Sequence, residues 1–210
     1  MATQNQPPSP SGDPLEILLK HYVKDFVRQN HAARILSEGL EAVGIGFWPV
    51  IDHLTFRTHD IDKRAEEFLK HKYTYDSEFG VLEYNNWFAK VYRKPGFPAL
   101  FIDQAYLGER GKGSLIPDWV KAFGDKTLHH VAVRVEDIEK AVSSLHKKGV
   151  KLAGEIVGDA GSDLRQIFTE PEMKQGKAFS VVELTERHRG YGGFSPPQAN
   201  RLMESTRLSY

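Results

Sequence analysis

The chain has 210 residues, in which 28 Lys and Arg balance 28 Asp and Glu, and hydrophobic residues make up 40%. This is an ordinary globular composition, and the balanced charge argues against nucleic-acid binding by phosphate neutralisation. The absence of cysteine excludes disulfides, thiol catalysis and metal–thiolate sites, so any metal would be held by His, carboxylate or amide oxygen. No apolar run reaches the about 20 residues of a membrane span, and the N-terminus lacks signal-peptide features. We therefore expect a cytoplasmic protein without a membrane partner.

The first 126 residues divide into four segments of different composition and hydrophobic pattern. Residues 1–13 combine Pro with Gln, Ser and Gly and predict a disordered tail. Residues 14–48 place apolar side chains at helical spacing and predict a helical lead-in. From residue 49 to 104, strand alternation, a helical run and three short β-rich pieces separated by Gly, Pro and Asn predict a first βαβββ module. Residues 105–126 are rich in Gly and read as a connector with one short helix around Trp119.

The pattern of the first module then returns in residues 127–210. The segment 128–142 matches 51–65 register for register, with His130 on His53 and Arg134 on Arg57, so the period is 130 − 53 = 77 residues. The repeat predicts an α+β fold in which paired βαβββ modules form a curved antiparallel or mixed sheet around a cavity, followed by a C-terminal helix. A duplication retained only for packing is the rival explanation.

Three residues of the repeat have the chemistry of a metal site. His53 and His130 occupy the same position in the two predicted first strands, so both imidazoles should point into the shared cavity. Glu183 lies in the last predicted strand and would complete two nitrogens and one oxygen on one face of a metal, leaving positions open for substrate and dioxygen or water. Taken alone, each of these residues is more often a core or surface side chain.

Other candidates are weighed against this triad. Arg57 and Arg134 lie four residues after their histidines and could clamp a substrate carboxylate, or pair with a carboxylate of the fold. Asp103 could be a fourth ligand or a catalytic group, but we favour the interpretation that it is a turn residue at the end of its strand. Period-2 alternation predicts that His129 faces away from the cavity and is not a ligand, and that Glu186 does not face inward with Glu183. The remaining strand-flanking histidines are expected at the surface: His59, His71, His146 and His188.

With these residues the sequence resembles the vicinal-oxygen-chelate superfamily, whose paired βαβββ modules hold a metal through first-strand and last-strand residues. The second half is most similar to the catalytic domain of the 4-hydroxyphenylpyruvate dioxygenase family, in residues 128–138, 163–171 and 183–205. The resemblance implies that His53, His130 and Glu183 bind Fe(II), with Zn, Ni and Mn also compatible. It also implies that Gln166 contacts the substrate and that Phe194 packs over it beneath a closing C-terminal helix.

The resemblance implies a non-haem Fe(II) dioxygenase that decarboxylates a small 2-oxo acid with dioxygen. The His-x-x-x-Arg spacing of His53 and Arg57 is instead similar to the 2-oxoadipate dioxygenase/decarboxylase family. At the entry to the C-terminal helix, the sequence departs from the hydroxyphenylpyruvate pattern at Ser195, Pro196, Pro197 and Gln198. Two alternatives remain: a glyoxalase-type metal-dependent lyase or isomerase, and a non-catalytic ligand-sequestering protein of the same fold. The sequence leaves the substrate and the oligomeric state, monomer or homodimer, open.

Overall fold

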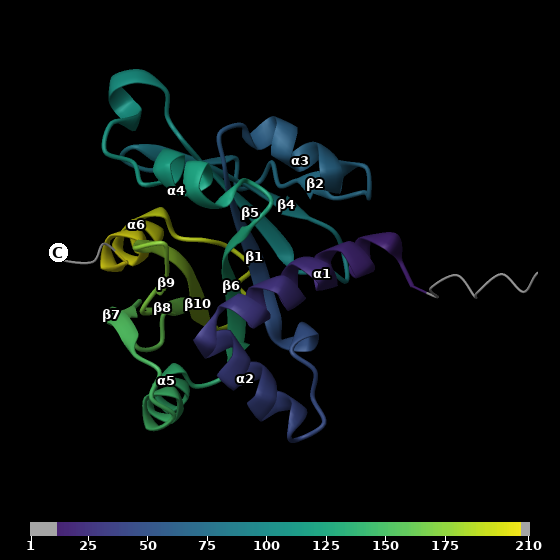
Figure 1. Cartoon of the computed structure of the whole chain (residues 1–210), viewed down its shortest axis with the longest axis vertical. Helices are drawn as coiled ribbons and strands as arrows, with labels where there is room; N and C mark the ends of the chain where they lie inside the picture. Colours follow the sequence, from purple (N-terminus) through teal and green to yellow (C-terminus); the bar gives the residue numbers. More distant parts are fainter. Residues whose placement is uncertain (1–11, 207–210) are drawn as a thin grey trace, which may run out of the picture.

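Two capped helices lead into the sheet in this computed structural model, which describes residues 12–206 (Figure 1). α1 (Pro14–Gln29) begins after Asp13, whose carboxylate accepts a hydrogen bond from the Leu15 N–H, and Pro14 suits the first helical position. α2 (His31–Glu41) begins after Asn30, whose side chain accepts from the Ala33 N–H. The tail expected over residues 1–13 lies almost wholly outside the described residues.

Each half of the remaining chain supplies a strand, a helix and further strands. The first set is β1 (Ile51–Thr58), α3 (Ile61–Leu69), β2 (Thr74–Tyr75), β3 (Val81–Glu83), β4 (Trp87–Arg93) and β5 (Ala99–Ala105). The second set is β6 (Leu128–Val135), α5 (Ile138–Lys147), β7 (Leu152–Val157), β8 (Leu164–Thr169), β9 (Glu172–Lys174) and β10 (Lys177–Arg187). Outside the two sets lie the 3-10 turns η1 (Trp48–Val50) and η2 (Gly108–Gly111), α4 (Ile116–Phe123) and α6 (Pro196–Ser205).

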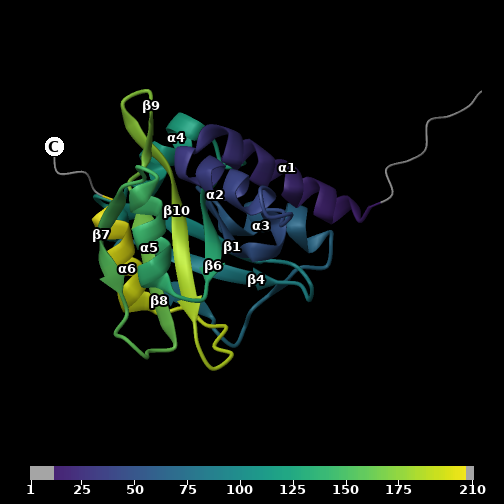
Figure 2. The same ribbon diagram turned by 90° about the horizontal axis from the view of Figure 1, so that it is seen from below.

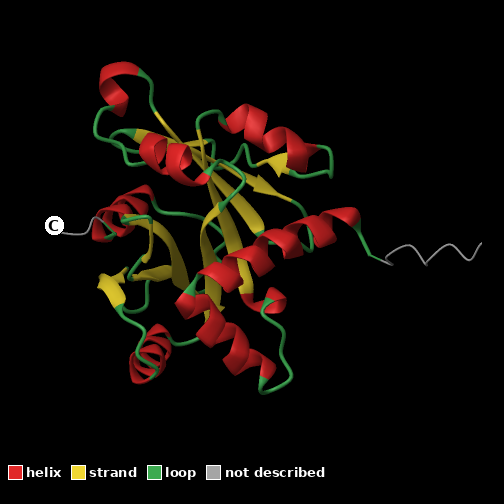
Figure 3. Ribbon diagram, viewed as in Figure 1, coloured by secondary structure: helices red, strands yellow, loops and turns green. Residues whose placement is uncertain are grey.

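The strands form one curved mixed sheet whose order reflects the repeat (Figure 3). The order is β2-β4-β5-β1-β6-β10-β8-β7, so each half contributes its strands in mirrored sequence. β1 pairs antiparallel with β6 at the centre, while β1 is parallel to β5 and β6 is parallel to β10. The expected α+β fold with a curved mixed sheet is confirmed, and its two equivalent first strands lie side by side.

The repeat extends to the way each half starts its helix. The Ile61 N–H at the start of α3 donates to the side chain of Gln104 on β5, and the Ile138 N–H at the start of α5 donates to Glu186 on β10. These contacts satisfy one of the free N–H groups that every helix N-terminus carries. Because Glu186 faces α5, it lies on the opposite side of β10 from Glu183, as alternation predicts.

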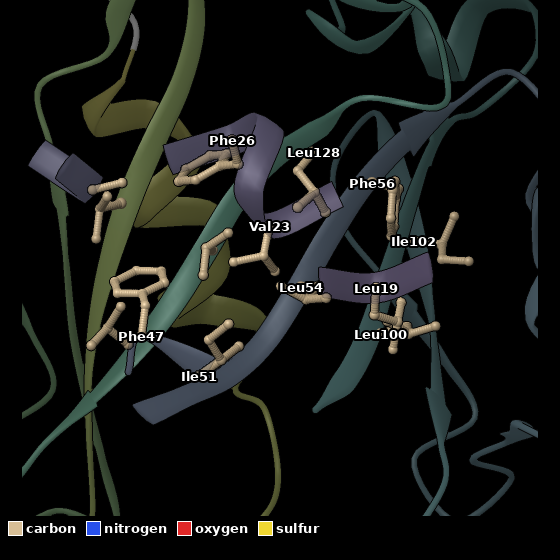
Figure 4. Close-up of a cluster of buried hydrophobic side chains, with 14 of the residues drawn as sticks. Leu19, Val23, Phe26, Phe47, Ile51, Leu54, Phe56, Leu100, Ile102 and Leu128 are labelled. Carbon is tan, nitrogen blue, oxygen red and sulfur yellow. The ribbon is translucent and has the colours of Figure 1, made fainter. Parts of the chain in front are cut away.

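The two faces of the sheet are covered differently. α1 crosses one face, where its Leu19, Val23 and Phe26 pack on Leu54 and Leu100 of the central strands (Figures 2 and 4). The opposite face carries His53, His130 and Glu183 and is covered by α4 and α6. Since both faces are buried, the central strands are apolar on one side and partly polar on the other. None of the helices in residues 12–206 combines the length and apolar character that crossing a bilayer requires.

Candidate metal centre

The three residues expected to bind a metal meet in the middle of the covered face. Nε2 of His53 lies 3.4 Å from Oε2 of Glu183, Nε2 of His130 lies 3.2 Å from the same oxygen, and the two nitrogens are 3.4 Å apart. All three side chains are buried. Their ligand atoms fall within 4.8 Å of one another, so the group could hold a divalent ion.

The strand register explains why these side chains converge. Thr55 of β1 lies opposite His130 of β6, which places the two histidines at the junction of the modules. On β10, Val181 is the partner of His130, so Glu183 lies two residues further along and faces the same side. The two modules therefore supply nitrogen ligands from first strands, and the second module alone supplies the oxygen from its last strand.

A β-bulge precedes each of the two histidines. The β1–β6 register shifts between Ile51 and His53, and again between His130 and Leu128. The extra residues are Asp52 and His129, which are 77 positions apart and therefore repeat-equivalent. A bulge breaks the alternation of a strand, so the prediction that His129 faces away from the cavity is wrong: it is buried and lines the same cavity as His130. His129 does not belong to the metal-ligand group.

Asp52 supports His53 from behind. Its Oδ1 lies 2.9 Å from Nδ1 of His53, and its two oxygens accept hydrogen bonds from Nε and Nη2 of Arg187, each at 2.8 Å. Arg187 also donates through Nη1 to the Gly193 carbonyl at 2.7 Å. A carboxylate behind a ligating histidine orients the ring and raises its basicity. Sequence reasoning missed both residues, although the adjacency of Asp52 to His53 was a signal.

Glu183 is held through its other oxygen. Oε1 accepts hydrogen bonds from the Gln166 amide at 2.5 Å and from the Thr185 hydroxyl at 2.6 Å. Oε2 therefore remains free to face the two histidines. Gln166, which the sequence resemblance casts as a substrate contact, lies in the cavity and contacts a metal-ligand candidate.

The charges of the triad are unequal. Burial lowers the pKa of His53, but the Glu183 charge and the hydrogen bond with Asp52 outweigh it and raise that pKa to about 9. Burial lowers the pKa of His130 to about 4, despite the opposing effect of Glu183. The pKa of Glu183, which burial alone would raise, falls well below its usual range because of His53 and His130. Without a metal, a His53–Glu183 ion pair beside a neutral His130 fits these shifts.

Asp103 and Arg57 lie beside the triad. Asp103 sits inside β5 with 2% of its surface exposed and lines the cavity, so the interpretation as a strand-terminating turn residue is wrong. Burial raises its pKa to about 7, against the effect of Arg57 and His53. Arg57 is also buried, donates to Sδ of Met203 at 2.9 Å, and lines a neighbouring cavity of about 420 Å³. Arg134 points elsewhere and pairs with Asp52.

A lid of C-terminal residues closes the centre. The ring of Phe194 packs edge-on against His53 at 5.1 Å and against Phe101 at 5.0 Å. Leu202 and Met203 of α6 also line the cavity, whose volume is about 40 Å³. That is room for a few water molecules, so α6 must move before a larger molecule can reach the triad.

The other histidines lie away from the centre. His59 and His146 are exposed and His71 is half-buried. His188 is half-buried and hydrogen-bonds through Nε2 to Glu186. None of them belongs to the group of potential metal ligands in the described part of the chain.

Comparison with known proteins bears on the fold. No family model matches the sequence, and no curated protein matches it either. Among solved structures, a candidate hydrolase from Shewanella frigidimarina is 17% identical, with 88% of this chain and 99% of that chain covered and a TM-score of 0.72. A candidate glyoxalase superfamily protein from Ralstonia eutropha is 13% identical, with 93% and 91% covered and a TM-score of 0.65.

A third solved structure is a mutant of 4-hydroxymandelate synthase from Streptomyces coelicolor. It is 19% identical, with 78% of this chain and 55% of that chain covered and a TM-score of 0.58. At these identities the likeness concerns the fold. The chain therefore shares its fold with these structures, one of which is a candidate glyoxalase superfamily protein.

Proposed function

We propose that this protein is a metal-dependent dioxygenase that decarboxylates a small 2-oxo acid, with Fe(II) held by His53, His130 and Glu183. The observation that carries the proposal is that the site offers three candidate protein ligands and not four. Glu183 lies two residues beyond the strand partner of His130, and the equivalent position in the first module, two residues beyond the strand partner of His53, is Phe101. The first module therefore supplies no carboxylate at that position. Two nitrogens and one carboxylate on one face leave several coordination positions open, the arrangement typical of non-haem Fe(II) oxygenases.

The bound ion would polarise the oxygens of a 2-oxo acid and activate dioxygen beside it. The residues of the chain would prepare and protect that site. Asp52 and Arg187 orient His53, while Gln166 and Thr185 orient Glu183. Phe194, Leu202 and Met203 would exclude water once α6 has closed.

We assign three residues to substrate binding. Phe194 packs edge-on against the ring of His53, and Gln166 lines the same cavity and donates to Glu183. Arg57 would clamp a substrate carboxylate. Its guanidinium has a buried Nε without a partner in the described residues, and its contact with Met203 would be released when α6 shifts.

A glyoxalase-type lyase or isomerase is the second candidate. The observation in its favour is Asp103, a buried carboxyl beside the triad with a pKa of about 7, which is suited to moving a proton near neutral pH. The metal-free sequestering protein has less support, because it needs neither the three convergent ligand-type residues nor the groups that orient them.

The test is an anaerobic titration of the metal-stripped protein with Fe(II) and then with 2-oxo acids. We expect a weak visible charge-transfer band, followed by oxygen uptake and release of carbon dioxide when air is admitted. Glu183→Ala should abolish both, and Asp103→Asn should retain them. A protein that binds Fe(II) but consumes no oxygen with any 2-oxo acid would overturn the dioxygenase. Loss of activity in the Asp103→Asn variant alone would favour the lyase or isomerase.

A further inference from the structure

We infer that His129 is a positioning residue for His130, holding the Nδ1–H of that ring so that its Nε2 faces the metal. The inference rests on the metal centre of the proposed function but not on its reaction. It concerns a residue that alternation along the strand excludes from the site. It therefore depends on the bulge at residue 129 and on the contacts that the bulge creates.

The two imidazoles meet through the nitrogens that face away from the metal site. Nδ1 of His129 lies 3.0 Å from Nδ1 of His130, with the ring planes 76° apart. The His129 ring is also packed edge-on against Trp119 at 5.6 Å, and it is buried. Packing on one side and a hydrogen bond on the other leave this ring little freedom to turn. The His129 ring is therefore held in one orientation next to His130.

Metal binding would fix the protons of both rings. Nε2 of His130 lies 2.8 Å from the Thr55 hydroxyl oxygen and faces Nε2 of His53 and Oε2 of Glu183, and a metal bound there needs the lone pair of that Nε2. A neutral imidazole then carries its proton on Nδ1 and must donate it. Among the described residues, Nδ1 of His129 is the hydrogen-bond partner of that nitrogen, at 3.0 Å. His129 must therefore accept at Nδ1 and carry its own proton on Nε2.

The repeat gives the two ligand histidines different supports. Asp52 stands behind His53 at the bulge of β1, and His129 stands behind His130 at the equivalent bulge of β6. Asp52 is an anion fixed by two hydrogen bonds from Arg187, whereas His129 is an acceptor fixed by packing against Trp119. One ligand is thus held by charge and the other by an oriented ring, and both supports are required for the two Nε2 atoms to converge.

The experiment compares three substitutions at this position in the full-length, metal-stripped protein. Asn places a side-chain oxygen near the position of Nδ1 and can still accept, while the longer Gln carries its polar end near the position of Nε2. Leu offers no acceptor. Affinity for Co(II) is measured by competition with a chromophoric chelator, and the visible Co(II) spectrum reports the ligand geometry.

We expect His129→Leu and His129→Gln to weaken Co(II) binding about 10- to 100-fold, the usual effect of losing the group behind a ligating histidine. His129→Asn should stay within about threefold of the parent and keep its Co(II) spectrum. His59→Leu, at an exposed position, is the matched control and should change nothing. Urea unfolding of the metal-free variants shows whether His129→Leu disturbs the fold. If it does, the test is the comparison of Co(II) affinity between His129→Gln and His129→Asn.

Two results would overturn the inference: parent-like affinity in the Leu and Gln variants, or equal losses with Asn and Gln, which would indicate packing alone. A parent protein that binds no divalent ion would overturn both this inference and the proposed function. Tight Co(II) binding that depends on His129, in a protein that consumes no oxygen with 2-oxo acids, would leave this inference standing and remove only the dioxygenase.

Discussion

Arg57 and Asp103 lie opposite each other on β1 and β5, both fully inside the protein, and each keeps a buried polar atom without a partner in the described residues. The atoms are Nε of Arg57 and Oδ1 of Asp103. Unpartnered buried charges are costly, and such atoms beside a cavity can be satisfied by a bound polar molecule. In the proposed function, the pair would receive the polar end of a substrate.

The buried carboxyl of Asp103 should make stability depend on pH. Its pKa of about 7 in the folded protein is raised by burial above the ordinary 3.8. Between pH 4 and 7 the folded state therefore binds more protons than the unfolded state, so the stabilising protonated form is lost as pH rises. The effect is roughly 4 kcal/mol at most, since one pKa unit corresponds to about 1.4 kcal/mol.

Urea unfolding of the metal-free parent and Asp103→Asn between pH 5 and 8.5 measures this effect. We expect the free energy of unfolding of the parent to fall relative to that of the variant from pH 5 to about pH 7 and to level off above that pH. Asp159→Asn, at an exposed position, should give a constant difference from the parent. A constant difference for Asp103→Asn would show that Asp103 titrates normally.

Replacing Phe101 with Glu should add a fourth ligand. Because Phe101 corresponds to Glu183 by register and its ring lies 6.2 Å from the ring of His53, the new carboxylate would face the centre. We expect the metal-free variant to be less stable by a few kcal/mol, because a buried carboxylate lacks a partner, and divalent metal to restore its stability.

Binding of Zn(II) to Phe101→Glu, measured by chelator competition, should tighten by about tenfold or more, since each tenfold change is about 1.4 kcal/mol. Oxygen uptake with a 2-oxo acid should fall sharply, because the added oxygen leaves too few open positions for both a chelating 2-oxo acid and dioxygen. Phe101→Leu keeps an apolar side chain and should retain parental metal affinity. Unchanged Zn(II) affinity in the Glu variant would contradict the equivalence of the two positions.

The fold and the three convergent residues could be predicted because both follow from the internal repeat of the sequence. His53 and His130 recur at the same place in matching segments, and the last strand offers Glu183 at a position of the right parity. The strand order of the structure follows from two copies of one module placed with their first strands adjacent. Local pattern and duplication carry this information, so a single sequence was enough.

The surroundings of the triad were less predictable, because they depend on register and long-range pairing. A bulge adds one residue without changing composition, so alternation misplaced His129. Asp103 was taken for a turn residue because it lies near the end of its strand, whereas β5 continues to Ala105. Asp52 and Arg187 are separated by 135 residues, and nothing in either local pattern indicates that they pair.

The Asp52–Arg187 pair should be among the strongest polar interactions of the fold and should also affect the metal. Both side chains are 5% exposed, and the guanidinium binds the carboxylate through two nitrogens. Arg187→Met or Asp52→Asn removes the doubly hydrogen-bonded partner of a buried charge, which costs up to about 3–5 kcal/mol. After Arg187→Met, Asp52 keeps its contacts with Arg134 and His53. Removing both partners should cost less than the sum of the single changes, because the stranded charge is gone.

A double-mutant cycle measures this effect: the free energy of unfolding in urea is determined for the parent, the two single variants and the double variant. Arg189→Met is the matched control. Arg189 pairs with Asp163 at 2.7 Å, but these side chains are 64% and 46% exposed, so its loss should cost below about 1 kcal/mol. Co(II) affinity should fall about 10- to 100-fold in both Asp52→Asn and Arg187→Met, because His53 loses an anchored carboxylate behind its ring. Strictly additive losses, or parental Co(II) affinity in both variants, would mean that the pair stabilises β1 and β10 without orienting His53.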